Sequence, residues 1–91
     1  MKILLFGDDW GLPLLLNHIP YEKICGIIGA SIRPEQKRSL IELSRRYKLP
    51  FFMQPRKSDQ EYVDFKEFVR DIAPDMIWVN SYSMVIGVIR D

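Results

Sequence analysis

The fold is decided by a short stretch near the N-terminus, residues 3–11, which reads ILLFGDDWG. Its first four residues form an unbroken apolar run, which is typical of a parallel strand buried on both faces. Gly7 ends that run, and Pro13 lies where the first turn of a helix tolerates a missing backbone N–H. The stretch therefore predicts a buried strand, a loop with two aspartates, and a helix over residues 12–17.

The same alternation of apolar runs and amphipathic stretches continues to the end of the chain. Further strands are expected at residues 24–30, 50–53 and 76–79, with helices over 34–48 and 58–72 between them, the last capped by its first two residues. Because strands and helices alternate, we expect right-handed crossovers and a parallel sheet. The predicted fold is α/β, a Rossmann-like doubly wound parallel sheet in three αβα layers with about four strands. The side chains expected in the core are Leu40, Leu43, Ser44, Tyr47, Tyr62, Phe65, Val69, Ile72 and Trp78.

Length and composition indicate one small domain. The chain has 91 residues and a formal net charge of +1, without the basic excess that is typical of nucleic-acid-binding proteins. Cys25 is the single cysteine, which excludes an internal disulfide and a multi-cysteine metal site. No apolar run is long enough to span a bilayer, and the N-terminus does not read as a signal peptide. We therefore expect a cytoplasmic setting and no membrane partner.

Charge is distributed unevenly between two of the predicted helices. Residues 33–48 carry six bases and two acids, a local net charge of +4. Residues 58–75 carry six acids and two bases, a local net charge of −4. Two solvated helix faces explain this pattern, and a basic docking face for an anionic partner is the alternative interpretation.

Several kinds of chemistry are excluded by the motifs. The first loop lacks the G-x-G-x-x-G and P-loop patterns, and Asp8 and Asp9 would repel a phosphate at the start of the following helix. An acidic pair after the first strand is also found in phosphoacceptor receiver domains, but no aspartate follows the third strand before Asp59. His18 lies at the far end of the first helix and Cys25 lies inside an apolar strand, so neither is expected to be catalytic.

Ligands of open parallel sheets bind beyond the carboxyl ends of the strands. Three segments of this chain are expected there, at residues 7–11, 30–33 and 80–83. The two aspartates of the first segment can cap the helix that follows or bind an amine-bearing substrate. Trp10, next to them, can form the wall of a pocket.

Five segments together resemble the folate-dependent formyltransferases. The opening MKILLFG at 1–7 and PLL at 13–15 resemble the start of these enzymes. The segment LPFFMQP at 49–55 resembles the family's G-I-P-V-x-Q-P, and APDMIWV at 73–79 with YSMVI at 82–86 resembles P-D-L-I-V-V-x-x-Y-x-x-I-L. The segments follow the family's order and spacing and are spread over nearly the whole length of the chain. The resemblance implies a Rossmann-like sheet and transfer of a formyl group from 10-formyltetrahydrofolate to an amine.

The resemblance also implies a division of the site between this chain and later residues. The segment after the fourth strand lines the pterin pocket in the family, although core packing is the alternative role for its apolar residues here, and Gly87 stands where the family often has proline. The family's catalytic Asn-x-His motif and later Asp lie downstream, so residues 1–91 are expected to be a single formyltransferase-type N-terminal domain, truncated before that motif and inactive alone. The expected cofactor-binding residues are Ser83, Met84, Val85 and Ile86, and the expected substrate-binding residues are Asp8, Asp9, Trp10 and Tyr82.

The amine acceptor can be narrowed by comparison with the family. Members that act on initiator tRNA have a longer basic insertion where this chain has only residues 31–33. The acidic pair argues against glycinamide ribonucleotide, because the members that bind it grip its phosphate with the first loop. An amino sugar, in particular a nucleotide-linked one, is therefore the favoured small-molecule acceptor, and methionyl-tRNA is second.

A non-catalytic role is the alternative function. A doubly wound domain of this size can act as a binding or interaction module. An uncovered strand at residues 76–79 would also leave a sheet edge open, which predicts a homodimer or aggregation through that edge.

Overall fold

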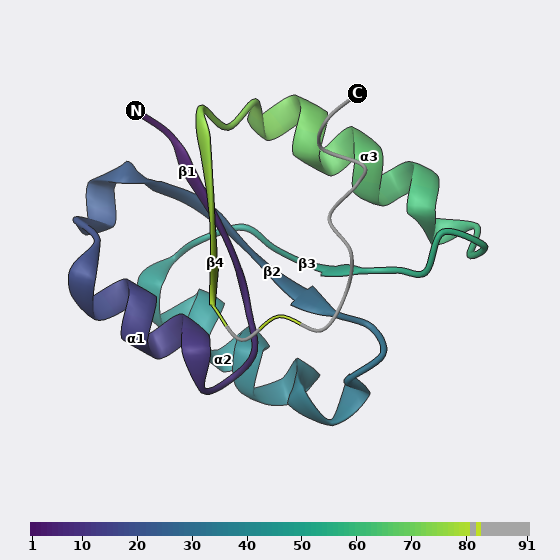
Figure 1. The fold of residues 1–91 in the computed structure, drawn as a ribbon, viewed down its shortest axis with the longest axis horizontal. Helices are drawn as coiled ribbons and strands as arrows, with labels where there is room; N and C mark the ends of the chain where they lie inside the picture. Colours follow the sequence, from purple (N-terminus) through teal and green to yellow (C-terminus); the bar gives the residue numbers. More distant parts are fainter. Residues whose placement is uncertain (81, 83–91) are drawn as a thin grey trace.

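The structure is a computed structural model, and it describes residues 1–80 and 82 (Figure 1). Strands and helices alternate in the predicted order, with short 3₁₀ turns before β2 and α2. The elements are β1 (Ile3–Gly7), α1 (Gly11–His18), η1 (Tyr21–Lys23), β2 (Ile24–Ala30), η2 (Pro34–Gln36), α2 (Lys37–Tyr47), β3 (Phe51–Gln54), α3 (Glu61–Ile72) and β4 (Met76–Asn80).

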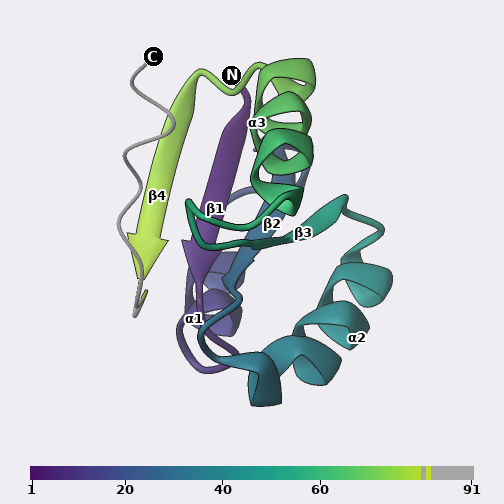
Figure 2. The ribbon, with the colours of Figure 1, turned by 90° about the vertical axis from the view of Figure 1, so that its right-hand side faces the viewer.

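The four strands form one parallel sheet in the order β3-β2-β1-β4. β1 lies at the centre of the pairing, with Phe6 opposite Ile28 of β2 and Val79 of β4. Figure 2 shows the strands side by side with α3 packed against one face. The predicted α/β, Rossmann-like parallel sheet is confirmed.

Helices cover both faces of the sheet (Figure 1). On one face, Leu5 packs in a buried cluster with Leu12 of α1 and Leu40 of α2. On the other face, Phe6 packs in a cluster with Phe65 of α3. Successive side chains of a strand point to opposite faces, which is why an unbroken apolar run suits β1. Within the described part, no helix is long and apolar enough to cross a membrane.

The predicted core-facing stripes of the two longer helices are confirmed, whereas the predicted start of α3 is wrong. Phe65 and Val69 of α3 are buried, as are Leu40, Leu43 and Ser44 of α2. α3 begins at Glu61 without a side-chain cap, so Ser58 and Asp59 do not cap it. The carboxylate of Asp59 instead accepts the backbone N–H of Arg56 at 3.0 Å and closes the turn before the helix.

Among the described residues, β4 is an edge strand, as expected from the sequence. Met76, Trp78 and Val79 are all large apolar residues that remain exposed there. The prediction that Trp78 lies in the core is wrong, because 39% of its surface is exposed. An apolar strand at an edge has no neighbour on its outer side, so its side chains lack half of the partners that a central strand has. The predicted homodimer through this edge stays a prediction.

Candidate functional site

The carboxyl ends of β1 and β4 meet at the point where the strand order reverses. After β1 the chain adds β2 and β3 on one side of it, whereas β4 joins on the other side. Open parallel sheets bind their ligands in the crevice at such a reversal. We call the residues gathered here, 7–11, 80 and 82, the switch-point site.

Gly7 allows the two strand ends to approach each other closely. A Cβ atom at this position would lie 2.6 Å from the carbonyl oxygen of Asn80 and 2.9 Å from the Cγ atom of Leu12. The side-chain amide of Asn80 in turn donates a hydrogen bond to the carbonyl oxygen of Gly11 at 3.2 Å. Glycine and amide together hold the end of β4 against the start of α1.

Asp8 stabilises the first turn of α1. Its carboxylate oxygen Oδ1 accepts the backbone N–H groups of Trp10 and Gly11, and its carbonyl oxygen accepts that of Leu12 at 3.0 Å. These donors have no partner within the helix, so the contacts satisfy groups that would otherwise need water. Asp8 is not the N-cap residue of α1, a position that Trp10 occupies without a side-chain cap, but its carboxylate is engaged by the backbone N–H groups of Trp10 and Gly11.

Alanine substitutions should separate the two aspartates of the loop. We expect Asp8→Ala to lower the free energy of unfolding by about 1 kcal/mol, because two backbone donors lose their acceptor. Asp9→Ala is the matched control, and we expect it to change stability by less than about 0.5 kcal/mol. Urea unfolding monitored by circular dichroism measures both, and equal effects would contradict the assignment.

Asp9 and Trp10 are the exposed groups of the switch-point site. The Asp9 carboxylate makes no hydrogen bond or ion pair with any residue of the described part. The Trp10 side chain is 67% exposed. A carboxylate in water next to an exposed indole offers both a negative charge and a flat apolar surface to a ligand. The predicted contact of Asp8, Asp9 and Trp10 with substrate stays a prediction.

Tyr82 follows β4 in the chain, and its side chain reaches past β1 and β2 to Gln54 of β3. Its ring packs edge-on against Phe6, with ring centres 5.2 Å apart. Its hydroxyl donates to the Oε1 atom of Gln54 and lies 3.4 Å from the carbonyl oxygen of Gly29. Burial raises the pKa of the Tyr82 phenol, so it stays protonated and remains a donor. The structure assigns this side chain a cross-sheet contact, and its predicted contact with substrate stays a prediction.

Two polar residues, one within the switch-point site and one bonded to its Tyr82, were not among the predicted site residues. Asn80 and the buried Gln54 both lie at the carboxyl end of an apolar strand, and both bond to groups from other elements. A polar side chain at the end of an apolar run is the signal that could have found them. The hydrogen bonds from Asn80 to Gly11 and from Tyr82 to Gln54 join positions far apart in the sequence, so local pattern alone could not assign them.

The histidine and the cysteine of the chain lie away from the switch-point site. His18 is the last residue of α1 and is exposed. Burial raises the pKa of the Cys25 thiol, which disfavours the reactive thiolate form. In residues 1–80 and 82, no group of three or more His, Cys, Asp and Glu is placed to hold a metal. The predicted cofactor-binding residues Ser83, Met84, Val85 and Ile86 lie outside the described residues.

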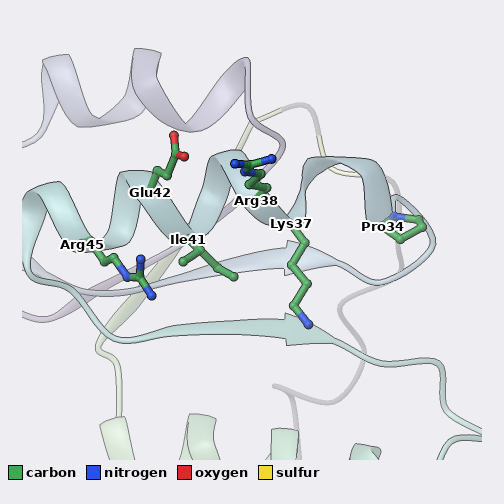
Figure 3. A pocket seen from close by; sticks show the side chains of 6 residues that line it. All are labelled: Pro34, Lys37, Arg38, Ile41, Glu42 and Arg45. Carbon is green, nitrogen blue, oxygen red and sulfur yellow. The ribbon is translucent and has the colours of Figure 1, made fainter.

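Two surface grooves lie away from the switch-point site. One, of about 440 Å³, follows the outer side of η2 and α2, and Figure 3 shows its lining side chains. The other, of about 450 Å³, lies beside β3 and is largely apolar. The first groove is lined by Pro34, Lys37, Arg38, Ile41, Glu42 and Arg45.

Comparison of the sequence and of the structure with known proteins finds no relative of this chain. No protein-family model, curated protein or solved structure matches it. Its fold is established by the sheet order and the helix layers.

Proposed function

We propose that this chain supplies the formyl-donor side of a folate-dependent formyltransferase site, with 10-formyltetrahydrofolate as co-substrate and a small amine as acceptor. One observation carries the proposal. The loop at 8–10 and the end of β4 converge at the reversal of the strand order, directly before the predicted pterin-binding residues 83–86. An open parallel sheet holds its ligand at this place.

The reaction makes two demands on a protein. The acceptor nitrogen attacks the formyl carbon, and the bond from that carbon to the folate nitrogen then breaks. The attack creates an oxyanion that needs hydrogen-bond donors, and the amine must lose a proton to a base while the departing nitrogen gains one. The Asn-x-His motif that serves these needs in the resembling family does not occur in these 91 residues. The chain is therefore proposed to bind and orient the reactants.

The exposed pair in the first loop favours an amino sugar as the acceptor. Asp9 offers a carboxylate for the amine, and the Trp10 indole offers an apolar face for a sugar ring. Asp8 is half-buried and occupied by the backbone of α1, so it contributes through the shape of the loop. Methionyl-tRNA remains the second proposed acceptor.

A titration with 5-formyltetrahydrofolate tests the proposal. This stable analogue of the donor is added to the ¹⁵N-labelled Trp78→Phe variant, in which the indole N–H signal belongs to Trp10 alone. We expect saturable shifts of that signal and of the backbone signals of Asp9 and Asn80. Nuclear magnetic resonance is preferred to fluorescence because the folate itself absorbs light.

Two methionine variants provide the matched comparison. Met84→Lys changes the predicted pterin wall and is expected to weaken binding at least tenfold, since a charge would enter an apolar contact. Met76→Lys makes the same change at the first residue of β4, where the side chain is exposed, and is expected to bind normally. Absence of any shift at millimolar ligand, in a folded sample, would favour the alternative of a non-catalytic interaction module.

A further inference from the structure

The groove beside β3 is apolar in the middle and oppositely charged at its two sides. Its floor is formed by Phe51, Phe52 and Met53 of the edge strand, all partly buried. Lys37, at the start of α2, lines it from one face of the sheet, and Glu61, at the start of α3, from the other face. We call this surface the β3-edge groove. Among the described residues, Ser31, Pro55 and Asp59 also line it.

The opposite charges continue along both helices that flank the groove. The segment 33–48, which contains α2, has a net charge of +4, and the segment 58–75, which contains α3, has −4. Within the described part of the chain, Arg70 and Glu67, both on α3, form an ion pair with nitrogen and oxygen 3.9 Å apart, and no ion pair joins α2 to α3. The basic and acidic helices therefore do not neutralise each other within one molecule. Lys37 points from α2 toward the end of β3 (Figure 3).

We propose that the β3-edge groove is the docking surface for a second copy of this chain. A two-fold axis parallel to β3 exchanges the two faces of the sheet while it keeps the strand direction. α2 of one copy then lies beside α3 of the other, so Lys37 meets Glu61 of the second copy twice in the dimer. The apolar floors face each other between these contacts. This inference does not depend on formyl transfer.

The two helices are matched in length and direction for this arrangement. Both α2 and α3 start at the carboxyl edge of the sheet and run back along it. With 11 and 12 residues they are about 16 and 18 Å long. The basic start of α2 in one copy can therefore face the acidic start of α3 in the other. Apolar contact would supply the affinity, and the charges would select the partner and its orientation.

The same charges oppose the other symmetric way of joining two β3 edges. A two-fold axis perpendicular to the sheet would extend it through antiparallel strands. That axis places α2 beside α2 and α3 beside α3, so charges of equal sign would meet. Pro55, directly after β3, also has no backbone N–H with which to lengthen such a ladder. The charge pattern therefore selects the dimer in which the faces are exchanged.

Charge reversal tests the proposal, with sedimentation velocity as the measurement. We expect the unmodified chain to dimerise at low salt and each of Lys37→Glu and Glu61→Lys to raise the dimer dissociation constant at least tenfold. A one-to-one mixture of these two variants should recover dimerisation, because every contact between them again joins opposite charges. Circular dichroism establishes that each variant is folded.

The control pair is Glu22→Lys and Lys23→Glu, which make the same changes on exposed residues of η1. We expect both to dimerise like the unmodified chain. The proposal is overturned if the unmodified chain is a monomer at millimolar concentration, or if the mixture of the two groove variants stays monomeric. A dimer that resists Lys37→Glu and is lost with Trp78→Lys would place the interface at β4 and also overturn it.

Discussion

Replacing Phe65 by alanine is expected to lower the free energy of unfolding by about 3–5 kcal/mol. Phe65 is fully buried where α3 packs on the sheet, and its ring centre lies 5.9 Å from that of Phe52 and 6.1 Å from that of Tyr62. Alanine would leave a cavity that neighbours on a strand and a helix cannot close. Since small domains have only about 5–15 kcal/mol of stability in total, the variant should lose a large share of its free energy of unfolding. Urea unfolding measured by circular dichroism gives the difference.

Val63→Ala is the control on the same helix. The Val63 side chain is 61% exposed and contributes nothing to the core clusters. We expect its substitution to change the free energy of unfolding by less than about 0.5 kcal/mol. Similar losses at both positions would show that α3 does not pack on the sheet through its Phe65 face.

Replacing Gly7 by alanine should cost about 3 kcal/mol of stability and disturb the switch-point site. The added Cβ would lie 2.6 Å from the carbonyl oxygen of Asn80, so the end of β1 and the end of β4 would have to separate. Backbone atoms within a paired sheet cannot yield as a flexible side chain can. We therefore also expect the side-chain amide signal of Asn80 to shift, because its hydrogen bond to Gly11 depends on this close approach.

Gly26→Ala is the matched substitution on the neighbouring strand. A Cβ atom at Gly26 would meet the methyl ends of Leu4 and Ile72 at 3.1 and 3.2 Å, and these can move by small rotations. We expect a cost under about 1 kcal/mol, partly offset by the lower entropy of the unfolded chain. If Gly7→Ala were as mild as this control, the described contact between β1 and β4 would be wrong, and with it the geometry of the switch-point site.

The two substitutions probe different parts of the molecule. Phe65 tests the packing of a layer, which any doubly wound domain requires. Gly7 tests the place where the first loop meets β4, on which the proposed function depends. We expect Phe65→Ala to be less stable but to bind folate under conditions where it is folded. We expect Gly7→Ala to bind folate poorly even where it is folded. These two results together would separate the fold from the site.

Most element types could be predicted because their signals are local. The run at 3–6 is apolar without interruption, and the helix α3 repeats Phe65 and Val69 at helical spacing. The start of α3 was predicted wrongly for an equally local reason. Asp59 is able to cap a helix, but its carboxylate bonds back to the N–H of Arg56, and both uses fit the same sequence.

The exposure of Trp78 shows where local reasoning ends. The run at 76–79 reads like β1, yet β4 is an edge strand of the described sheet, whereas β1 is paired on both sides. Apolar composition predicts that a segment is a strand. It does not say how many neighbours the strand will have, because that number depends on segments elsewhere in the chain.

The amino-acid sequence by itself determined the order of strands and helices and the buried faces of α2 and α3. Only the tertiary structure decided that β1 lies between β2 and β4, that Asn80 reaches Gly11, and that Tyr82 turns toward Gln54. Periodicity and capping act over a few residues, so they can be read along the chain. The contact of Tyr82 with Gly29 joins positions 53 residues apart, and only the pairing of the strands brings such positions together.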